Sequence, residues 1–122
     1  MPRLPSKTFT DRELEIMRVV WKFGEASTRQ IQELLPGDRH YNSVMTIIRV
    51  LEKKNHLTHR EDGRAFIYRA TVSPEKARAR VLKHLLKHVF GGSAASMVVG
   101  LVETGDLTAE DLDAIRRKVR SQ

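Results

Sequence analysis

A helical repeat of apolar side chains near the middle of the chain constrains the fold more than any other feature. Val44, Ile47, Ile48 and Leu51 stand at i, i+3, i+4 and i+7. This spacing puts four branched side chains along one stripe, and it predicts a helix over Tyr41–Lys54 with that stripe buried. Because such a stripe must be covered by other elements, the neighbouring segments decide the architecture.

The segments on either side of this helix carry clear start and stop signals. Ser27 is a good N-cap for a shorter helix, which Pro36-Gly37-Asp38 ends. After the longer helix come two stretches with strand character, His56–Arg60 and Ala65–Ala70, and Asp62-Gly63 between them favours a tight turn. Two helices joined by a short turn and followed by a hairpin predict a winged helix-turn-helix.

An earlier helix is predicted from its capping signals. Thr10 and Glu13 have the spacing of a capping box, and Phe9 and Leu14 have that of a hydrophobic staple. Apolar residues then recur at steps of three and four as far as Trp21. Because Trp21 lies on this stripe, we interpret it as a core residue rather than as a platform for a ligand.

The remaining segment, 73–122, is predicted to contain three more helices, at about 74–90, at about 94–103 and from Thr108 onward. The middle one is apolar nearly all round, so it needs burial on more than one side. So small a segment cannot supply that burial, because too much of its own surface stays exposed. A second copy of the chain would supply it. The residues expected in that homodimer interface are apolar: Val81, Leu85, Val89, Met97, Val98, Leu101, Val102, Leu112 and Ile115.

These patterns predict a mainly α fold with a small β-hairpin. We expect a winged helix-turn-helix DNA-binding domain at 1–72 and a helical dimerisation domain of three helices at 73–122. The net charge is +7, and residues 39–72 carry seven Lys or Arg against three Asp or Glu. A basic stretch inside a folded domain suggests a nucleic-acid partner, with a merely solvated basic surface as the alternative.

The polar face of the 41–54 helix and the hairpin tip carry the candidate DNA contacts. Their side chains can donate to phosphates or read base edges, and a twofold dimer suits a two-part, palindromic site on double-stranded DNA. The expected DNA-binding residues are Arg39, Tyr41, Asn42, Ser43, Met45, Thr46, Arg49, Lys53 and Arg64.

Other function classes find little support. The chain has no cysteine, no glycine-rich phosphate loop and no evident catalytic triad, so we expect neither an enzyme nor a cofactor.

His84 and His88 have a spacing that can share a metal, but Lys83 and Lys87 beside them oppose a cation, so we interpret this face as solvated and expect no metal site. No apolar run is long enough to span a bilayer, and we expect a cytoplasmic protein without membrane insertion. The basic helix at 74–90 could lie on a membrane surface, but a dimer core accounts for its apolar face better.

Three segments resemble the BlaI/MecI family of penicillinase repressors. They are Thr10–Trp21 (TDRELEIMRVVW), Tyr41–Lys54 (YNSVMTIIRVLEKK) and Asp62–Tyr68 (DGRAFIY). The resemblance implies a dimeric winged-helix repressor that binds an inverted-repeat operator. It also implies control of β-lactam resistance genes, and relief of repression when a membrane sensor protease triggers cleavage of the C-terminal region.

The chain departs from the family pattern at two functional places. The family's recognition helix commonly reads Thr-Thr-Val where this chain has Asn42-Ser43-Val44, and an arginine usual one position later stands here at Arg49. The staphylococcal members are cut between Asn and Phe, and the matching positions here are Gly100-Leu101. These departures leave the base preference and the position of any cut open. Copper-responsive relatives use cysteine pairs, which this chain does not have.

Overall fold

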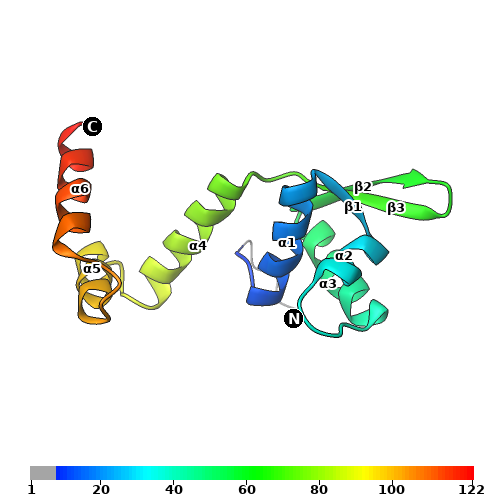
Figure 1. The fold of residues 1–122 in the computed structure, drawn as a ribbon, viewed down its shortest axis with the longest axis horizontal. Coiled ribbons are helices and arrows are strands. Elements are labelled where there is room, and N and C mark those ends of the chain that lie inside the picture. Colours follow the sequence, from blue (N-terminus) through cyan, green and yellow to red (C-terminus); the bar gives the residue numbers. More distant parts are fainter. Residues whose placement is uncertain (1–7) are drawn as a thin grey trace, which may run out of the picture. The chain divides into compact units, whose positions relative to one another are not determined.

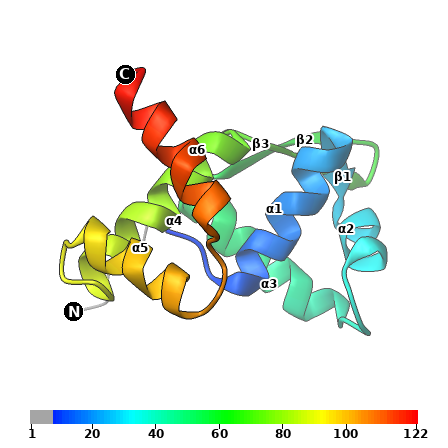
Figure 2. The same ribbon diagram turned by 60° about the vertical axis from the view of Figure 1, so that its left-hand side comes forward.

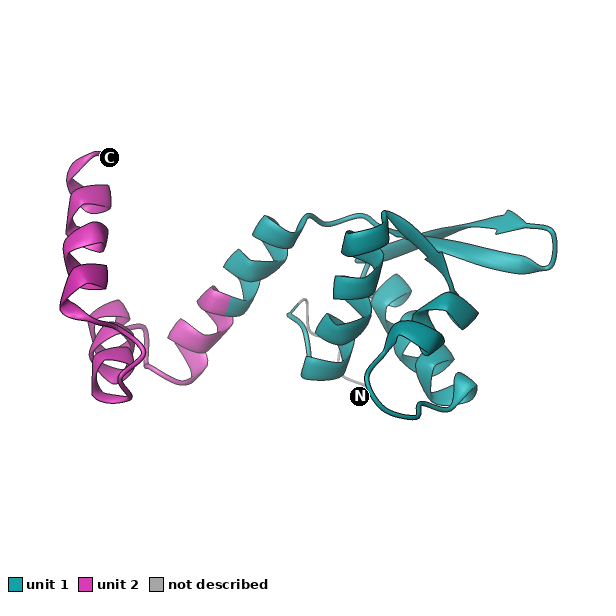
Figure 3. Cartoon of the chain, viewed as in Figure 1, with its two compact units in different colours: residues 1–81 teal, residues 82–122 magenta. Residues whose placement is uncertain are grey.

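The computed structural model describes residues 8–122, which form two compact units that meet between residues 81 and 82 (Figures 1 and 3). The described part is mainly α-helical with one small antiparallel sheet. Its elements are, in chain order, α1 (Asp11–Phe23), β1 (Glu25–Ser27), α2 (Thr28–Leu34), α3 (Tyr41–Lys53), β2 (Leu57–Asp62), β3 (Ala65–Ala70), α4 (Pro74–His88), α5 (Ala94–Glu103) and α6 (Ala109–Arg120).

Side-chain capping sets the starts of α1 and α2, whereas His40 before α3 makes no capping bond. Thr10 and Glu13 form the predicted capping box at α1, and Ser27 forms one with Gln30 at α2. Each pair satisfies two backbone N–H groups that the first turn of a helix leaves without partners. The predicted bounds of the first three helices are therefore confirmed to within a residue or two.

The core of the first unit gathers side chains from all its elements. Tyr68 from β3 is 1% exposed, and burial, together with the nearby Glu52 carboxylate, raises its pKa, so the hydroxyl stays neutral. Trp21 packs against this core while staying partly exposed. The buried apolar residues are Phe9, Ile16, Met17, Val19, Val20, Ala26, Ile31, Leu35, Val44, Ile48, Leu51, Leu57, Tyr68, Val72 and Ala77.

The sheet has the strand order β1-β3-β2, with both pairs antiparallel. Strand β1 was not predicted, because three residues are too few to show an alternating pattern. Asp62 pairs with Ala65, which leaves Gly63 and Arg64 as the turn. Gly63 has a φ of +63°, which glycine adopts without steric cost. The hairpin β2–β3 extends past the helices of its unit (Figure 1).

The two units meet inside α4 (Figure 3). Val72 and Ala77 are buried in the core of the first unit, so the start of α4 packs with the winged-helix elements. The first compact unit therefore extends to residue 81, whereas the sequence predicted the end of the DNA-binding domain at residue 72. The assignment of 73–122 to dimerisation stays a prediction.

The second unit contains the end of α4 together with α5 and α6, and α6 runs away from α5 to the C-terminus in both views (Figures 1 and 2). Ser93 caps α5, and Thr108 forms a capping box with Asp111 at α6. None of the residues of α5 is buried in the single chain; Val99 is 53% exposed and Val102 is 42% exposed. The unit thus leaves much apolar surface uncovered.

One buried ion pair joins the start of α1 to the end of α3. The Lys54 ammonium lies 2.9 Å from Oε1 and 2.8 Å from Oε2 of Glu13, and only the contact to Oε1 has hydrogen-bond geometry. Lys54 also donates to the carbonyl of Thr8 at 3.1 Å, while Oε1 of Glu13 accepts from the backbone N–H of Thr10 at 2.8 Å. Both charged side chains are more than nine-tenths buried.

We predict that Lys54→Met lowers the free energy of unfolding by about 3–5 kcal/mol, because it leaves the Glu13 carboxylate buried without its counter-charge. Urea unfolding followed by circular dichroism measures the change. The control is Arg60→Gln, which breaks the half-exposed pair with Glu25 and should leave stability nearly unchanged. Equal effects of the two substitutions would contradict this account.

Candidate nucleic-acid interface

Helix α3 presents two faces with different chemistry. Val44, Ile48 and Leu51 are buried in the core, and Ile47 packs against it. Because the stripe faces inward, the intervening positions must face outward. The exposed predicted contacts on this helix are Tyr41, Asn42, Ser43, Thr46, Arg49 and Lys53.

Two of the predicted contacts on α3 already have partners inside the chain. The hydroxyl of Thr46 donates to the carbonyl of Asn42 at 2.9 Å. The sulfur of Met45 accepts from the hydroxyl of Thr28 at 3.3 Å, and Met45 is partly buried. Met45 therefore lies against α2, where it helps to set the spacing of α2 and α3 as well as offering apolar surface.

Arg39 has a structural role that the sequence did not reveal. Its guanidinium lies 2.7 Å from the Glu15 carboxylate, and its Nε donates to the carbonyl of Pro36 at 3.2 Å. The side chain of Gln32 donates to the carbonyl of Arg39 at 2.8 Å. These bonds hold the turn between α2 and α3 against α1. Arg39 thus has a structural partner in Glu15, and its contact with DNA stays a prediction.

The wing is joined to the rest of its unit by a histidine–carboxylate hydrogen bond and by one half-exposed ion pair. His59 Nδ1 lies 2.8 Å from Glu52 of α3, and Arg60 lies 2.9 Å from Glu25 of β1. The ring of His59 also stacks on Phe66, with 4.3 Å between centroids. Arg64 therefore stands at the turn of an anchored hairpin.

A groove of about 630 Å³ lies between α2, α3 and the wing. Arg29, in the first turn of α2, lines it together with Tyr41 and Arg64. Sequence reasoning missed Arg29, and its position two residues after the Ser27 N-cap is the signal that could have found it. The residues that line the groove are Ser27, Thr28, Arg29, Tyr41, Met45, Asp62, Arg64, Ala65 and Phe66.

Cations named so far in the winged-helix unit fall into two groups. Arg39, Lys54 and Arg60 are paired with carboxylates. The exposed cations Arg29, Arg49, Lys53 and Arg64 form no ion pair with any residue in 8–122. Exposed cations without internal partners leave a positive potential, which favours a polyanion such as DNA.

Other kinds of site find no support in the described part of the chain. Residues 8–122 hold no group of three or more His, Cys, Asp or Glu side chains that could bind a metal. The rings of His84 and His88 are tilted relative to each other with 4.4 Å between their centroids, and they have no third candidate ligand among the described residues. No described helix combines the length and the apolar character needed to cross a membrane.

The penicillinase repressor family model matches residues 9–121. The chain belongs to this family. It is a family of DNA-binding transcriptional repressors, which confirms the expectation of a regulator rather than an enzyme.

Proteins with related sequences align with most of this chain. A penicillinase repressor of Bacillus licheniformis is 28% identical over 118 residues, which is 94% of this chain and 90% of the relative. The methicillin resistance regulatory protein MecI of Staphylococcus aureus (strain N315) is 25% identical over 117 residues, which is 93% of this chain and 95% of the relative. An uncharacterised 16.5 kDa protein of Latilactobacillus sakei is 30% identical over 105 residues, 84% of this chain and 72% of that protein.

Solved structures confirm the winged-helix fold. The solution structure of the DNA-binding domain of the repressor BlaI matches with a TM-score of 0.53 and 28% identity, over 62% of this chain and 93% of that one. Monomeric BlaI of B. licheniformis in complex with the blaP half-operator matches with a TM-score of 0.50 at the same identity and coverage. A MarR mutant from E. coli, with a TM-score of 0.52, 11% identity and 93% coverage of this chain (76% of its own), is alike in fold alone.

The residues predicted for dimerisation lie mostly on the second unit. Leu85, Val89, Met97 and Leu101 line an apolar groove of about 470 Å³ there. Val81 is the exception, because it belongs to the first unit and packs against its core. The other members are partly or largely exposed: Val98, Val102, Leu112 and Ile115.

The bond between Gly100 and Leu101 lies inside α5, with Gly100 partly buried and the Gly100 carbonyl accepting from the backbone N–H of Thr104 at 3.0 Å. Proteases cleave most readily at exposed, locally unfolded segments. A cut at this bond therefore requires α5 to unwind first.

We predict that Arg64→Gln and Arg29→Gln each weaken binding to random double-stranded DNA and flatten the log–log salt dependence by about 0.9, the value for one lost phosphate contact. Fluorescence anisotropy at several salt concentrations measures the slope. The charge-matched control is Lys118→Gln on α6, which should leave the slope unchanged. A loss confined to operator DNA would show instead that these residues read bases.

Proposed function

We propose that this chain represses transcription as a homodimer that binds an inverted-repeat operator, with one winged-helix unit on each half-site. The observation that carries the proposal is the division of α3 into a buried apolar face and an exposed polar face, flanked by cations on α2 and the wing that have no ion-pair partner in 8–122. Membership of a repressor family supports it, as does the relative whose monomeric form was solved with a half-operator.

Helix α3 enters the major groove in this proposal. Its exposed face offers Asn42, whose amide can bond to adenine, and Arg49, whose guanidinium can bond to guanine. Ser43 and Thr46 add hydroxyls, although that of Thr46 already donates to the Asn42 carbonyl. The helix is thus suited to reading a sequence as well as to holding phosphates.

Phosphate contacts come from both sides of that helix. Arg29 and Arg64 line the groove beside α3, and Lys53 stands in its last turn. Contacts of this kind set the position of a protein on the duplex and carry little base information. In this proposal the phosphate contacts supply most of the affinity for DNA, and the exposed face of α3 supplies the preference for one base sequence.

The second unit supplies the dimer contact. Its groove is lined mainly by apolar side chains, and several apolar residues outside the groove are exposed as well, among them Val99 and Val102. A second copy would bury this surface, as expected for a symmetric interface. Linking two winged-helix units raises the effective concentration of each at its own half-site, so dimerisation strengthens binding without new DNA contacts.

Relief of repression would follow from breaking this unit. Cleavage or unfolding of α5 would release single winged-helix units, and each would bind its half-site alone. The names of two relatives, a penicillinase repressor and a methicillin resistance regulatory protein, support β-lactam resistance genes as the regulated genes. The family resemblance adds a membrane sensor protease that triggers cleavage of the C-terminal region. Because Gly100-Leu101 lies within a helix, such a protease would need to capture an opened state.

We predict that Arg49→Ala weakens binding to the operator by about 1–3 kcal/mol, the range for one lost bidentate base contact, and weakens binding to random DNA far less. The operator is first located by footprinting the DNA upstream of the chain's own gene, and gel shifts then measure both affinities. If the affinities for operator and for random DNA fell equally, Arg49 would contact a phosphate and not a base.

We predict that Leu101→Asp shifts the full chain from dimer to monomer in sedimentation at micromolar concentration and weakens operator binding, because a carboxylate in an apolar interface has no partner. Ser96→Asp adds the same charge at an exposed position of α5 and is the control. Circular dichroism shows whether the helices persist. A Leu101→Asp protein that remains dimeric would place the interface elsewhere.

A further inference from the structure

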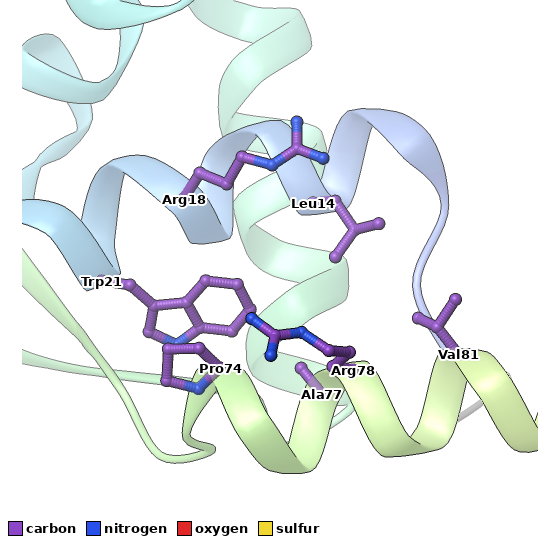
Figure 4. A pocket seen from close by; sticks show the side chains of 7 residues that line it. All are labelled: Leu14, Arg18, Trp21, Pro74, Ala77, Arg78 and Val81. Atoms are coloured by element: carbon purple, nitrogen blue, oxygen red, sulfur yellow. The ribbon is translucent and has the colours of Figure 1, made fainter. Parts of the chain in front are cut away.

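A cavity of about 460 Å³ lies between α1 and the first two turns of α4, within the first unit (Figure 4). Its volume is in the range of small-molecule sites. It shares no residue with the groove that faces DNA. The residues that line it are Leu14, Arg18, Trp21, Pro74, Ala77, Arg78 and Val81.

The apolar part of this cavity is held in place by the core. Trp21 Nε1 donates to the carbonyl of Val72 at 2.9 Å, so the polar atom of the indole has its partner and the ring is fixed. Ala77 is buried, and Leu14 and Val81 pack against the same core. An occupant would therefore meet a preformed apolar surface with a flat aromatic ring.

The polar part of the cavity is positive. Arg18 stands on the α1 side and Arg78 on the α4 side; the Arg78 side chain extends toward Trp21, and the Arg18 guanidinium is drawn pointing away from α4 (Figure 4). Both arginines are exposed, and neither forms an ion pair with a residue in 8–122. Within residues 8–122, no acidic side chain lines the cavity. Arginine matches a carboxylate in shape and charge, so this lining favours an anion and opposes a cation.

We propose that this cavity binds a small organic carboxylate with a compact apolar body. The body lies on Trp21, Pro74 and Val81, and the carboxylate lies against Arg78, with the exposed side chain of Arg18 turning toward it. Because the ligand contacts α1 and α4 together, it fixes the start of α4 on the winged-helix unit. This inference does not depend on the DNA sequence that the protein recognises.

The single tryptophan provides a direct test on the full chain. Its indole N–H gives one cross-peak in a ¹H–¹⁵N spectrum, and the bond to Val72 keeps that proton in place. We expect cyclohexanecarboxylate to shift this peak in a saturable way. Cyclohexylmethanol, which lacks the charge, should bind at least tenfold more weakly, and acetate, which lacks the body, should cause no saturable shift.

Substitutions inside and outside the cavity distinguish binding at this site from a general effect of the protein's positive charge. Arg78→Gln and Arg18→Gln should each lower the affinity for cyclohexanecarboxylate at least fivefold. Lys76→Gln on α4 and Arg12→Gln on α1 remove the same charge outside the cavity and should change it less than twofold. All four positions are exposed, so the fold should persist, and the position of the indole peak without ligand verifies this.

Several results would overturn the proposal. These are the absence of a saturable shift, equal binding of the alcohol, a saturable shift with acetate, or an unchanged affinity in both arginine variants. A cross-peak that moves with protein concentration in the absence of ligand would show that a second copy of the chain covers the cavity instead.

Discussion

The Glu13 carboxylate connects the elements on which the winged-helix unit depends. It caps α1 through the backbone of Thr10, and it neutralises Lys54 at the end of α3. A charge this deeply buried is tolerated only when its partner stays in place, so the pair resists any sliding of α3 against α1. The stripe of α3 residues on the core then determines which side chains face outward. The proposed DNA-reading face is thus oriented by contacts made on the opposite side of the same helix.

Pairing of charges separates structural cations from those available to a partner. Arg39, Lys54 and Arg60 each meet a carboxylate from a distant part of the chain and hold a turn, a helix end or the wing. Arg29 and Arg64 meet none among residues 8–122 and line one groove. A basic composition alone does not distinguish these groups, because the distinction depends on which acidic side chains the fold brings within reach. The cations without a carboxylate partner in 8–122 give the proposed DNA-binding side its positive potential.

Helix α4 has a different role at each of its ends. Its first turns carry Ala77 into the core of the winged-helix unit and form one wall of the cavity beside Trp21. Its last turns carry Leu85 and Val89, which line the apolar groove of the second unit. A ligand beside Trp21, or the unwinding of α5, would therefore act on the helix that is shared by the two compact units. Regulation of this kind would need no change in the residues that we propose contact DNA.

The sequence by itself determined the features that depend on neighbours within a few residues. The capping boxes at Thr10, Ser27 and Thr108, the α3 stripe and the glycine turn of the wing all follow from local backbone geometry. The tertiary structure alone decided the features that join distant segments. It brought Glu15 to Arg39, Glu13 to Lys54 and Trp21 to Val72, it paired β1 with β3, and it carried the first unit into α4. No periodicity encodes these contacts, because they arise only when the whole apolar core is buried at once and each polar group must find a partner in the space that remains.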